Sequence, residues 1–302
     1  MPASGLWWNS GARNQRLKAH IHNMALAARL KACPDTNQTF TRAVRWMQIE
    51  STARVLGTRS KRFFPQESFV KLQGIQLTWL GHSTFRVQTP EGKTLYIDPW
   101  IAGNPKCPES EKNVKKADVL ICTHGHGDHI GDAVDVGKKV NPVAVGIFEL
   151  CLWLQKKGVK QISPMNKGGT QTVAGVKITM VHAVHSCGIQ DGDQIVYGGE
   201  ACGYVLEFSN GVKLYHAGDT NVFGDMAIIR DLYAPKIAML PIGDLFTMSP
   251  REAAYACKLL QPETVIPMHF GTFPQLTGTP GELQKLVPDV EVLEMKPGKT
   301  IS

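Results

Sequence analysis

The stretch ICTHGHGDHIGD, residues 121–132, constrains the fold more than any other part of the sequence. It concentrates polar side chains directly after an apolar run, with Gly125 and Gly127 between them to permit a tight turn. Residues 117–123 (ADVLICT) predict a short strand buried on both faces, and residues 130–140 (IGDAVDVGKKV) have helical spacing. The stretch is therefore expected at a strand-to-helix junction, where open α/β sheets place their functional sites.

The side chains in this stretch are of the types that bind metal ions. His124 and His126 lie two positions apart and share one face of an extended chain. Asp128 and His129 follow just after the turn, so two ligand pairs point toward two neighbouring places. A single histidine is usually an ordinary surface or core residue, but four ligand-type side chains in six positions favour a metal site.

Composition limits the class of protein. The chain has 302 residues with 43% hydrophobic content, which is enough for one large core or two modest ones. No apolar run approaches the length of a membrane-spanning helix, and the first 20 residues lack the apolar region of a secretory signal. The seven cysteines include no CxxC pair, which argues against a zinc ribbon and fits a reducing compartment. We therefore expect a cytoplasmic protein, with an organellar presequence in residues 1–71 as the alternative.

The formal charge of +7 is divided unevenly along the chain. Residues 1–71 hold 12 Lys and Arg against 3 Asp and Glu, a net of +9, which leaves 21 against 23, or −2, for residues 72–302. The change predicts two parts: a basic N-terminal extension over 1–71 and a core domain over 72–302. An amphipathic stretch at 13–31 predicts that the extension is partly helical.

The role of this extension stays open between three interpretations. It is a helical segment that covers the core, an Arg-rich organellar presequence, or translated sequence upstream of the true start. A basic helix can also dock on anionic lipid, so a membrane surface is a candidate partner. Because the core is slightly acidic, nucleic acid is not an expected partner.

From residue 72 onward, strand and helix patterns alternate. Residues 75–89 and 93–101 predict two strands joined by the turn PEGK. A helix is expected over 148–157 and another over 250–260, which has Ser249 as N-cap and a proline at its first position. Further strands are expected at 144–148, 177–184, 202–209, 212–218, 237–243 and 264–270. Such a mixture favours two packed sheets flanked by helices.

The core carries motifs in an order that resembles the metallo-β-lactamase-fold hydrolases, and the resemblance spans residues 72–302. The motifs are IDPW, THGHGDH, AVHS, YHAGDT and PMHFGTF, together with GHSTF, YGGEACGY and PIGDLFTMSP. The core is most similar to the metal-dependent hydrolases related to L-ascorbate-6-phosphate lactonase, and more distantly to N-acylphosphatidylethanolamine-hydrolysing phospholipase D. The resemblance implies a four-layer αββα sandwich of the α/β class, with the site at one edge between the two sheets.

The resemblance also implies a binuclear metal site. One cation would be held by His124, His126 and His185, the second by Asp128, His129 and His269, and Asp219 would bridge the two. Two cations about 3.5–4 Å apart would lower the pKa of a bridging water, and the resulting hydroxide would attack a carbonyl or phosphoryl centre. Ligands that are all nitrogen and oxygen suit Zn²⁺, with Mn²⁺ and Fe²⁺ as alternatives.

The expected catalytic residues are Asp128, Asp98 and His82. We expect Asp98 to accept a ring N–H from a ligating histidine, so that the other ring nitrogen faces the metal. His82 either orients the substrate or protonates the leaving group, with a purely structural hydrogen bond as the alternative.

Two other histidines are not expected to bind metal. His182 precedes His185 by three residues and therefore faces the opposite way along a strand. His216 stands in the same relation to Asp219 and is expected to be a buried, hydrogen-bonded imidazole.

These observations favour a hydrolase of a small ester, lactone or phosphate-bearing molecule, which uses a hydroxide between two cations. The alternative is a phospholipase D-like lipid phosphodiesterase at a membrane surface, which needs an apolar lip; the candidates for that lip are Trp7, Trp8, Trp100 and Ile101. A binding protein with a vestigial site is disfavoured by the complete ligand set. We expect a small-molecule substrate, with specificity set by the loops at 187–203 and 273–280, and a homo-oligomer is a candidate assembly whose state stays open.

Overall fold

The computed structural model describes residues 72–302. The predictions for the basic extension, namely its partial helix and its contact with lipid, lie outside the described residues. The boundary at residue 71 stays a prediction.

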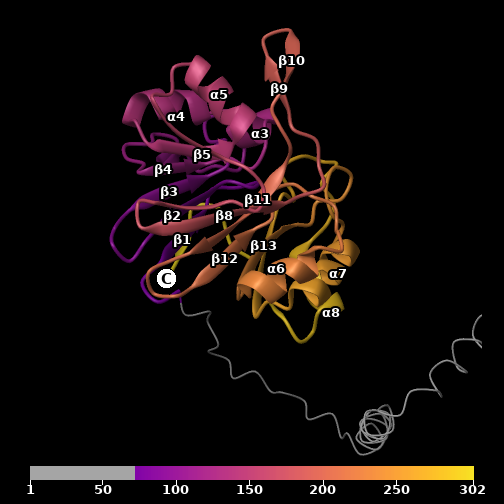
Figure 1. Cartoon of the computed structure of the whole chain (residues 1–302). Coiled ribbons are helices and arrows are strands. Elements are labelled where there is room, and N and C mark those ends of the chain that lie inside the picture. The colour runs from indigo at the N-terminus through magenta and orange to yellow at the C-terminus, as the bar shows by residue number, and fades with distance from the viewer. Residues whose placement is uncertain (1–71) are drawn as a thin grey trace, which may run out of the picture. The chain divides into compact units, whose positions relative to one another are not determined.

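The first of two large sheets has seven strands in the order β16-β1-β2-β3-β4-β5-β6 (Figure 1). Its strands β1 to β3 are antiparallel neighbours, whereas β3 to β6 run parallel. The strands are β1 (Gln76–Trp79), β2 (Phe85–Gln88), β3 (Thr94–Ile97), β4 (Val119–Ile121), β5 (Val143–Ile147), β6 (Gln161–Met165) and β16 (Thr300–Ile301). The predicted strand before the metal-ligand stretch is β4, and all of its residues are buried, as expected.

The second sheet repeats this plan with seven strands in the order β15-β14-β13-β12-β11-β8-β7. Its strands from β7 to β12 pair antiparallel, and those from β12 to β15 pair parallel. The strands are β7 (Thr170–Val173), β8 (Val176–His182), β11 (Cys202–Glu207), β12 (Lys213–His216), β13 (Ile237–Pro241), β14 (Thr264–Met268) and β15 (Glu291–Val292). Because the strands in one half of each sheet are parallel, their carboxyl ends lie at one edge of the molecule.

Helices cover the outer faces of both sheets and complete the four predicted layers (Figure 1). On the first sheet lie α4 (Ala133–Val140) and α5 (Phe148–Lys156), and on the second α6 (Met226–Tyr233), α7 (Pro250–Leu260) and α8 (Pro280–Leu286). Helix α7 begins where the sequence predicts, because Ser249 and Glu252 form a capping box ahead of it. The buried core between the layers includes Phe85 of the first sheet and Tyr215 of the second.

Residues 75–89 do not form the single strand predicted from their sequence. The chain turns back at residues 80–84, where Leu80 N–H donates to the Thr84 carbonyl at 2.9 Å. Gly81 and His82 adopt left-handed backbone conformations, with φ of 96° and 55°. Gly81 suits this position because a Cβ there would lie 2.6 Å from the Lys106 side chain. The turn therefore raises His82 at the edge of the sheet.

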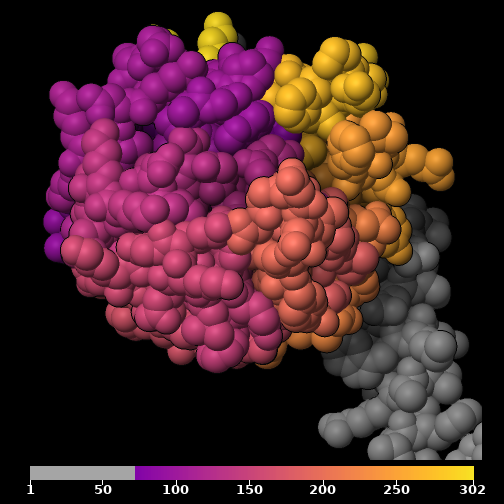
Figure 2. All heavy atoms as spheres, turned by 90° about the horizontal axis from the view of Figure 1, so that it is seen from above, coloured from indigo at the N-terminus to yellow at the C-terminus, as the bar shows by residue number. Residues whose placement is uncertain are grey.

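The segment 187–203, predicted as a loop, contains a hairpin of its own. Strands β9 (Gly188–Asp191) and β10 (Gln194–Tyr197) pair antiparallel around Gly192, whose φ is 61°. Ile189 is buried, and its side chain packs closely against Gly125 of the metal-ligand stretch. Apolar residues at alternate positions around a Gly-Asp turn are the signal for this hairpin. The hairpin projects beyond the two sheets in Figure 1 and stands forward in Figure 2.

Within residues 72–302, none of the helices is long and apolar enough to cross a membrane.

Candidate metal centre

The predicted ligands lie just after strand ends of both sheets and meet at one edge. His124 and His126 follow β4, and α3 (Gly127–Ile130) carries Asp128 and His129. The second sheet contributes His185 after β8, Asp219 after β12 and His269 after β14. The site is thus built from segments that are far apart in the sequence.

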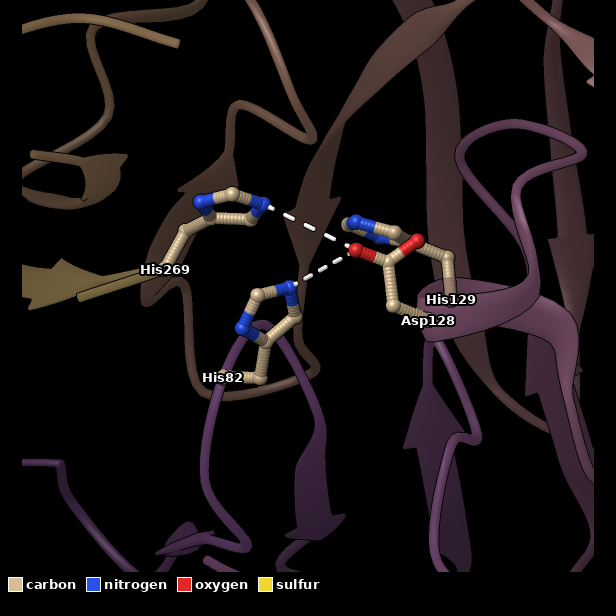
Figure 3. Close-up of side chains that lie close together, drawn as sticks. All are labelled: His82, Asp128, His129 and His269. Atoms are coloured by element: carbon tan, nitrogen blue, oxygen red, sulfur yellow. Dashed lines mark hydrogen bonds and ion pairs between the residues drawn. The ribbon is translucent and has the colours of Figure 1, made fainter. Parts of the chain in front are cut away.

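The ligand atoms of these residues fall into groups whose members lie within 4.8 Å of one another. We call His124, His126 and His185 the open group. We call His82, Asp128, His129 and His269 the enclosed group (Figure 3). The open group has the composition expected for the first cation, and the enclosed group contains the second expected trio together with His82.

Asp219 lies between the two groups, where the resemblance places a bridging carboxylate. Its Oδ2 is 3.2 Å from Nε2 of His129 and 3.0 Å from Nε2 of His269. The same oxygen lies 4.0 Å from Nε2 of His124 and 3.8 Å from Nε2 of His185. One carboxylate oxygen therefore contacts or approaches the ring nitrogens of both groups.

The open group is partly accessible to solvent. His126 and His185 are half-buried, whereas His124 is fully buried. His126 shares hydrogen bonds with His124, Nδ1 to Nε2 at 3.0 Å, and with Ser186 Oγ at 3.2 Å. Burial lowers the pKa of each of these three histidines, so the rings stay neutral and can offer lone pairs.

The enclosed group contains a hydrogen-bonded chain through His82. Its Nε2 lies 3.1 Å from Asp128 Oδ2, and its Nδ1 lies 3.0 Å from Thr272 Oγ1 (Figure 3). Burial lowers the pKa of His82 to about 4, so this imidazole carries a single ring proton. Because a carboxylate only accepts, that proton lies on Nε2, and Nδ1 accepts from the Thr272 hydroxyl. Burial alone would raise the pKa of Asp128, but the His82 hydrogen bond and the neighbouring His129 lower it overall.

Asp98 supports a histidine in each group through hydrogen bonds. It is fully buried and accepts from His129 Nδ1 at 2.8 Å, which leaves Nε2 of His129 directed into the cluster. It also accepts from the Thr123 hydroxyl at 2.7 Å, and that hydroxyl lies 3.0 Å from His124 Nδ1. The hydroxyl donates its single hydrogen to Asp98, so its oxygen accepts a hydrogen bond from His124 Nδ1–H. Asp98 therefore sets which ring nitrogen of His124 and of His129 is free for a metal.

The buried polar atoms of the cluster fit divalent cations. Nε2 of His129 and Oδ1 of Asp219 are buried without a hydrogen-bond partner. Burial alone would lower the pKa of His129, but Asp219 and Asp98 raise it well above its usual value. Buried carboxylates need cationic partners, and a divalent cation held by Asp219 and His129 would meet that need in place of a proton.

The remaining histidines of the described chain lie outside both groups. His182 is exposed, and its Nδ1 lies 3.0 Å from Nζ of Lys167. His216 is buried, as predicted, and its Nε2 hydrogen-bonds the Ser83 carbonyl at 3.2 Å. Its Nδ1 accepts from the Gly218 N–H, so both ring nitrogens are occupied.

The sequence interpretation missed Thr123 and Thr272, which hold ring nitrogens of His124 and His82. Their only sequence signal is position, because Thr123 directly precedes a predicted ligand and Thr272 follows one by three residues. The prediction of an apolar lip at Ile101 is wrong, because that side chain is 1% exposed. The neighbouring Trp100 is half-buried, and its ring meets that of His82 edge-on at 5.2 Å.

Comparison with known proteins identifies the family of this chain. The model of the beta-lactamase superfamily domain matches residues 76–269. A UPF0173 metal-dependent hydrolase of Koribacter versatilis is 66% identical over 231 residues, which cover 76% of this chain and 99% of that protein. A UPF0173 metal-dependent hydrolase of Methanopyrus kandleri is 45% identical over 230 residues, covering 75% and 99%.

A solved structure agrees with these relatives. The metallo hydrolase Igni18 from Ignicoccus hospitalis superimposes with a TM-score of 0.66 at 38% identity, covering 75% of this chain and 97% of that one. Together with the two mixed sheets and the histidine-aspartate cluster at their common edge, these matches show that the chain belongs to the UPF0173 metal-dependent hydrolases of the metallo-β-lactamase superfamily.

Proposed function

We propose that the protein hydrolyses a small ester, lactone or phosphate-bearing molecule with two divalent cations, one at each group. The observation that carries this proposal is the position of Asp219 Oδ2 among the Nε2 atoms of His129, His269, His124 and His185. When bound, two such cations supply Lewis-acid activation of water and of the substrate oxygen. The nitrogen and oxygen donors favour zinc, and manganese or iron is compatible with them.

The protein's own residues position the reaction. Asp98 orients His129 directly and His124 through Thr123. Asp128 is held by His82, whose single ring proton points at the carboxylate. We therefore assign His82 to positioning of Asp128 rather than to protonation of the leaving group, because that proton is already engaged.

Metal analysis paired with a substrate panel tests the proposal. We expect purified full-length protein to carry close to two equivalents of transition metal and to hydrolyse at least one of several lactones, phosphodiesters, thioesters and β-lactams. The resemblance to L-ascorbate-6-phosphate lactonase supports including lactones. A chelator should abolish turnover, and zinc, manganese or iron should restore it. A folded, active protein with one equivalent of metal or none would contradict the binuclear proposal.

A further inference from the structure

The loops around the metal centre form one continuous rim. Asn221 N–H donates to the Val184 carbonyl at 3.1 Å, which joins the loops after β8 and β12. The loop at 242–249 follows β13, the strand between β12 and β14. His269 N–H donates to the His82 carbonyl at 3.1 Å, which joins the loop after β14 to the turn between β1 and β2. The rim thus runs from the open group to the enclosed group.

This rim exposes large apolar side chains next to the predicted ligands. Val184 directly precedes His185 and is 42% exposed, and Phe273 follows His269 by four residues and is 36% exposed. Between them, the loop after β13 exposes Leu245 and Phe246 by 63% and 57%. Leu245 also has a positive φ of 35°, which is unfavourable for a residue with a side chain. Exposed apolar side chains gathered at a site mark a binding surface.

Two aromatic rings bring this apolar surface onto the enclosed group itself. The Trp100 ring lies 5.2 Å from the His82 ring, and the Phe273 ring lies 5.7 Å from it on a T-shaped contact. The two aromatic rings are 5.9 Å apart and inclined by 32°. Trp100 and Phe273 thus form an aromatic wall beside the residue that holds Asp128.

The polar chemistry of the site is concentrated at the predicted ligands, whereas the rim side chains Val184, Leu245, Phe246 and Phe273 are apolar. Polar reactive groups surrounded by apolar side chains are typical of sites that bind a substrate with one reactive polar group and an apolar remainder.

We propose that the rim binds an apolar substituent of the substrate, so that the enzyme prefers carbonyl esters or lactones that carry an alkyl or aryl group over their short, polar homologues. This inference rests on the proposed function, because it concerns the same site. Each methylene buried on the rim improves binding by up to about fourfold. For a butyl chain on a partly open rim, we expect a preference of at least about tenfold.

Matched lactones test the inference on the metal-loaded, full-length protein. γ-Butyrolactone and γ-octalactone differ by a butyl chain, and both turnover and equilibrium binding are measured for each. We expect kcat/KM and affinity to favour γ-octalactone by about tenfold or more. The double variant Phe246→Ser/Phe273→Ser should bring that ratio close to one. The control is Leu232→Ser on α6, which removes a side chain that is 66% exposed away from the rim and should leave the ratio unchanged.

The outcomes separate this inference from the proposed function. If neither lactone nor any other panel substrate is hydrolysed, but γ-octalactone still binds more tightly and the double variant loses that preference, the proposed function fails and the rim stands. Equal affinity and equal kcat/KM for the two lactones would contradict the proposal that the rim binds an apolar substituent. Binding to phosphatidylcholine vesicles that the double variant loses, with an unchanged lactone ratio, also overturns it, because the rim would then dock on lipid.

Discussion

The open and enclosed groups offer the same ligand chemistry in two different settings. In the open group, His126 and His185 are half-buried, and His126 hydrogen-bonds to His124 and to the Ser186 hydroxyl. In the enclosed group, His82 and His129 are fully buried, and each has a ring nitrogen held by a residue behind it. Solvent access lets a bound ion exchange, whereas buried and oriented ligands retain it.

The difference suggests two sites of unequal strength that share one support. Asp98 holds His129 directly, but it reaches His124 only through the Thr123 hydroxyl. Hydrogen-bonded partners of this kind typically change metal affinity by about 10–100-fold. We therefore expect chelators to empty the open group before the enclosed group.

The largest expected effect is that of Asp219→Ala, which removes the carboxylate between the groups. Turnover should fall by more than about 100-fold, beyond the effect of a supporting residue, and the protein should retain fewer than two metal equivalents. Metal content and kcat measure this, and Asp225→Ala, at an exposed carboxylate ahead of α6, is the control. An Asp219→Ala enzyme with near wild-type kcat would show that the bridge is assigned to the wrong residue.

Asp98→Asn should weaken both groups, and the enclosed group more. The carboxylate accepts the His129 ring N–H and the Thr123 hydroxyl at one oxygen and the Thr123 backbone N–H at the other. The amide has a single accepting oxygen and cannot serve both positions, so the ligating rings lose their fixed tautomers. We expect metal affinity to fall by about 10–100-fold, measured by competition with a chelator. Asp193→Asn, in the exposed turn of the β9–β10 hairpin, controls for the loss of a charge. Unaltered affinity at both sites would remove Asp98 from the support of the metals.

Two threonine variants should separate the groups in opposite directions. Thr123→Val removes the hydroxyl that links Asp98 to His124 and should weaken metal retention mainly at the open group. Thr272→Val removes the hydroxyl behind His82 and should weaken the enclosed group only. Thr272→Val loses one hydrogen bond, worth about 1 kcal/mol, so we expect about a fivefold loss at the enclosed group. Thr123→Val loses two, to His124 and to Asp98, so its loss at the open group should be at least as large. Biphasic chelation kinetics report the two sites, and equal changes in both phases would mean that the groups are not independently supported.

A variant of His216 tests whether the loss of folding stability at low pH arises from a residue outside the ligand groups. Burial lowers the pKa of His216, so below the ordinary histidine value the unfolded chain binds a proton that the folded protein does not. Stability from this residue is thus lost as the pH falls below about 6.5, by at most about 1.4 kcal/mol per pH unit. His216→Gln should therefore narrow the difference in Tm between pH 7.5 and pH 5.5. An unchanged difference would place the acid sensitivity elsewhere.

The smallest expected effect is that of His182→Ala. This exposed ring belongs to neither ligand group and contacts Lys167. Metal content and kcat should stay near their wild-type values, whereas His185→Ala should lower both. A loss of turnover as deep as that of His185→Ala would reverse the argument from strand alternation.

Short-range signals predicted much of the fold. Helix α7 begins at Pro250 because a capping serine and a proline at the first helical position specify a helix start locally. The turn at residues 80–84 escaped the same reasoning, because the apolar pattern continues through it. The turn is visible only in the structure, through the left-handed conformations of Gly81 and His82 and the hydrogen bond from Leu80 to Thr84.

The candidate site divides in the same way. Its metal-binding residue types could be identified from their motifs, although their roles stay predictions. The supporting contacts could not be predicted, because the bond between His82 and Thr272 joins residues that are 190 positions apart. The apolar rim was also hidden, since Trp100 and Ile101 are adjacent in the sequence and only the fold buries one and leaves the other half-exposed.

The pairing of β16 with β1 has a consequence for how the chain could be rearranged. Leu77 pairs with Ile301, so the first and last strands of residues 72–302 are antiparallel neighbours, and their outer ends lie about one strand spacing apart. A short linker from residue 302 to residue 72 would close the sequence into a ring. New ends between Gly192 and Asp193, both exposed in the β9–β10 turn, would then give a circular permutant that keeps both large sheets and every residue of the two groups intact.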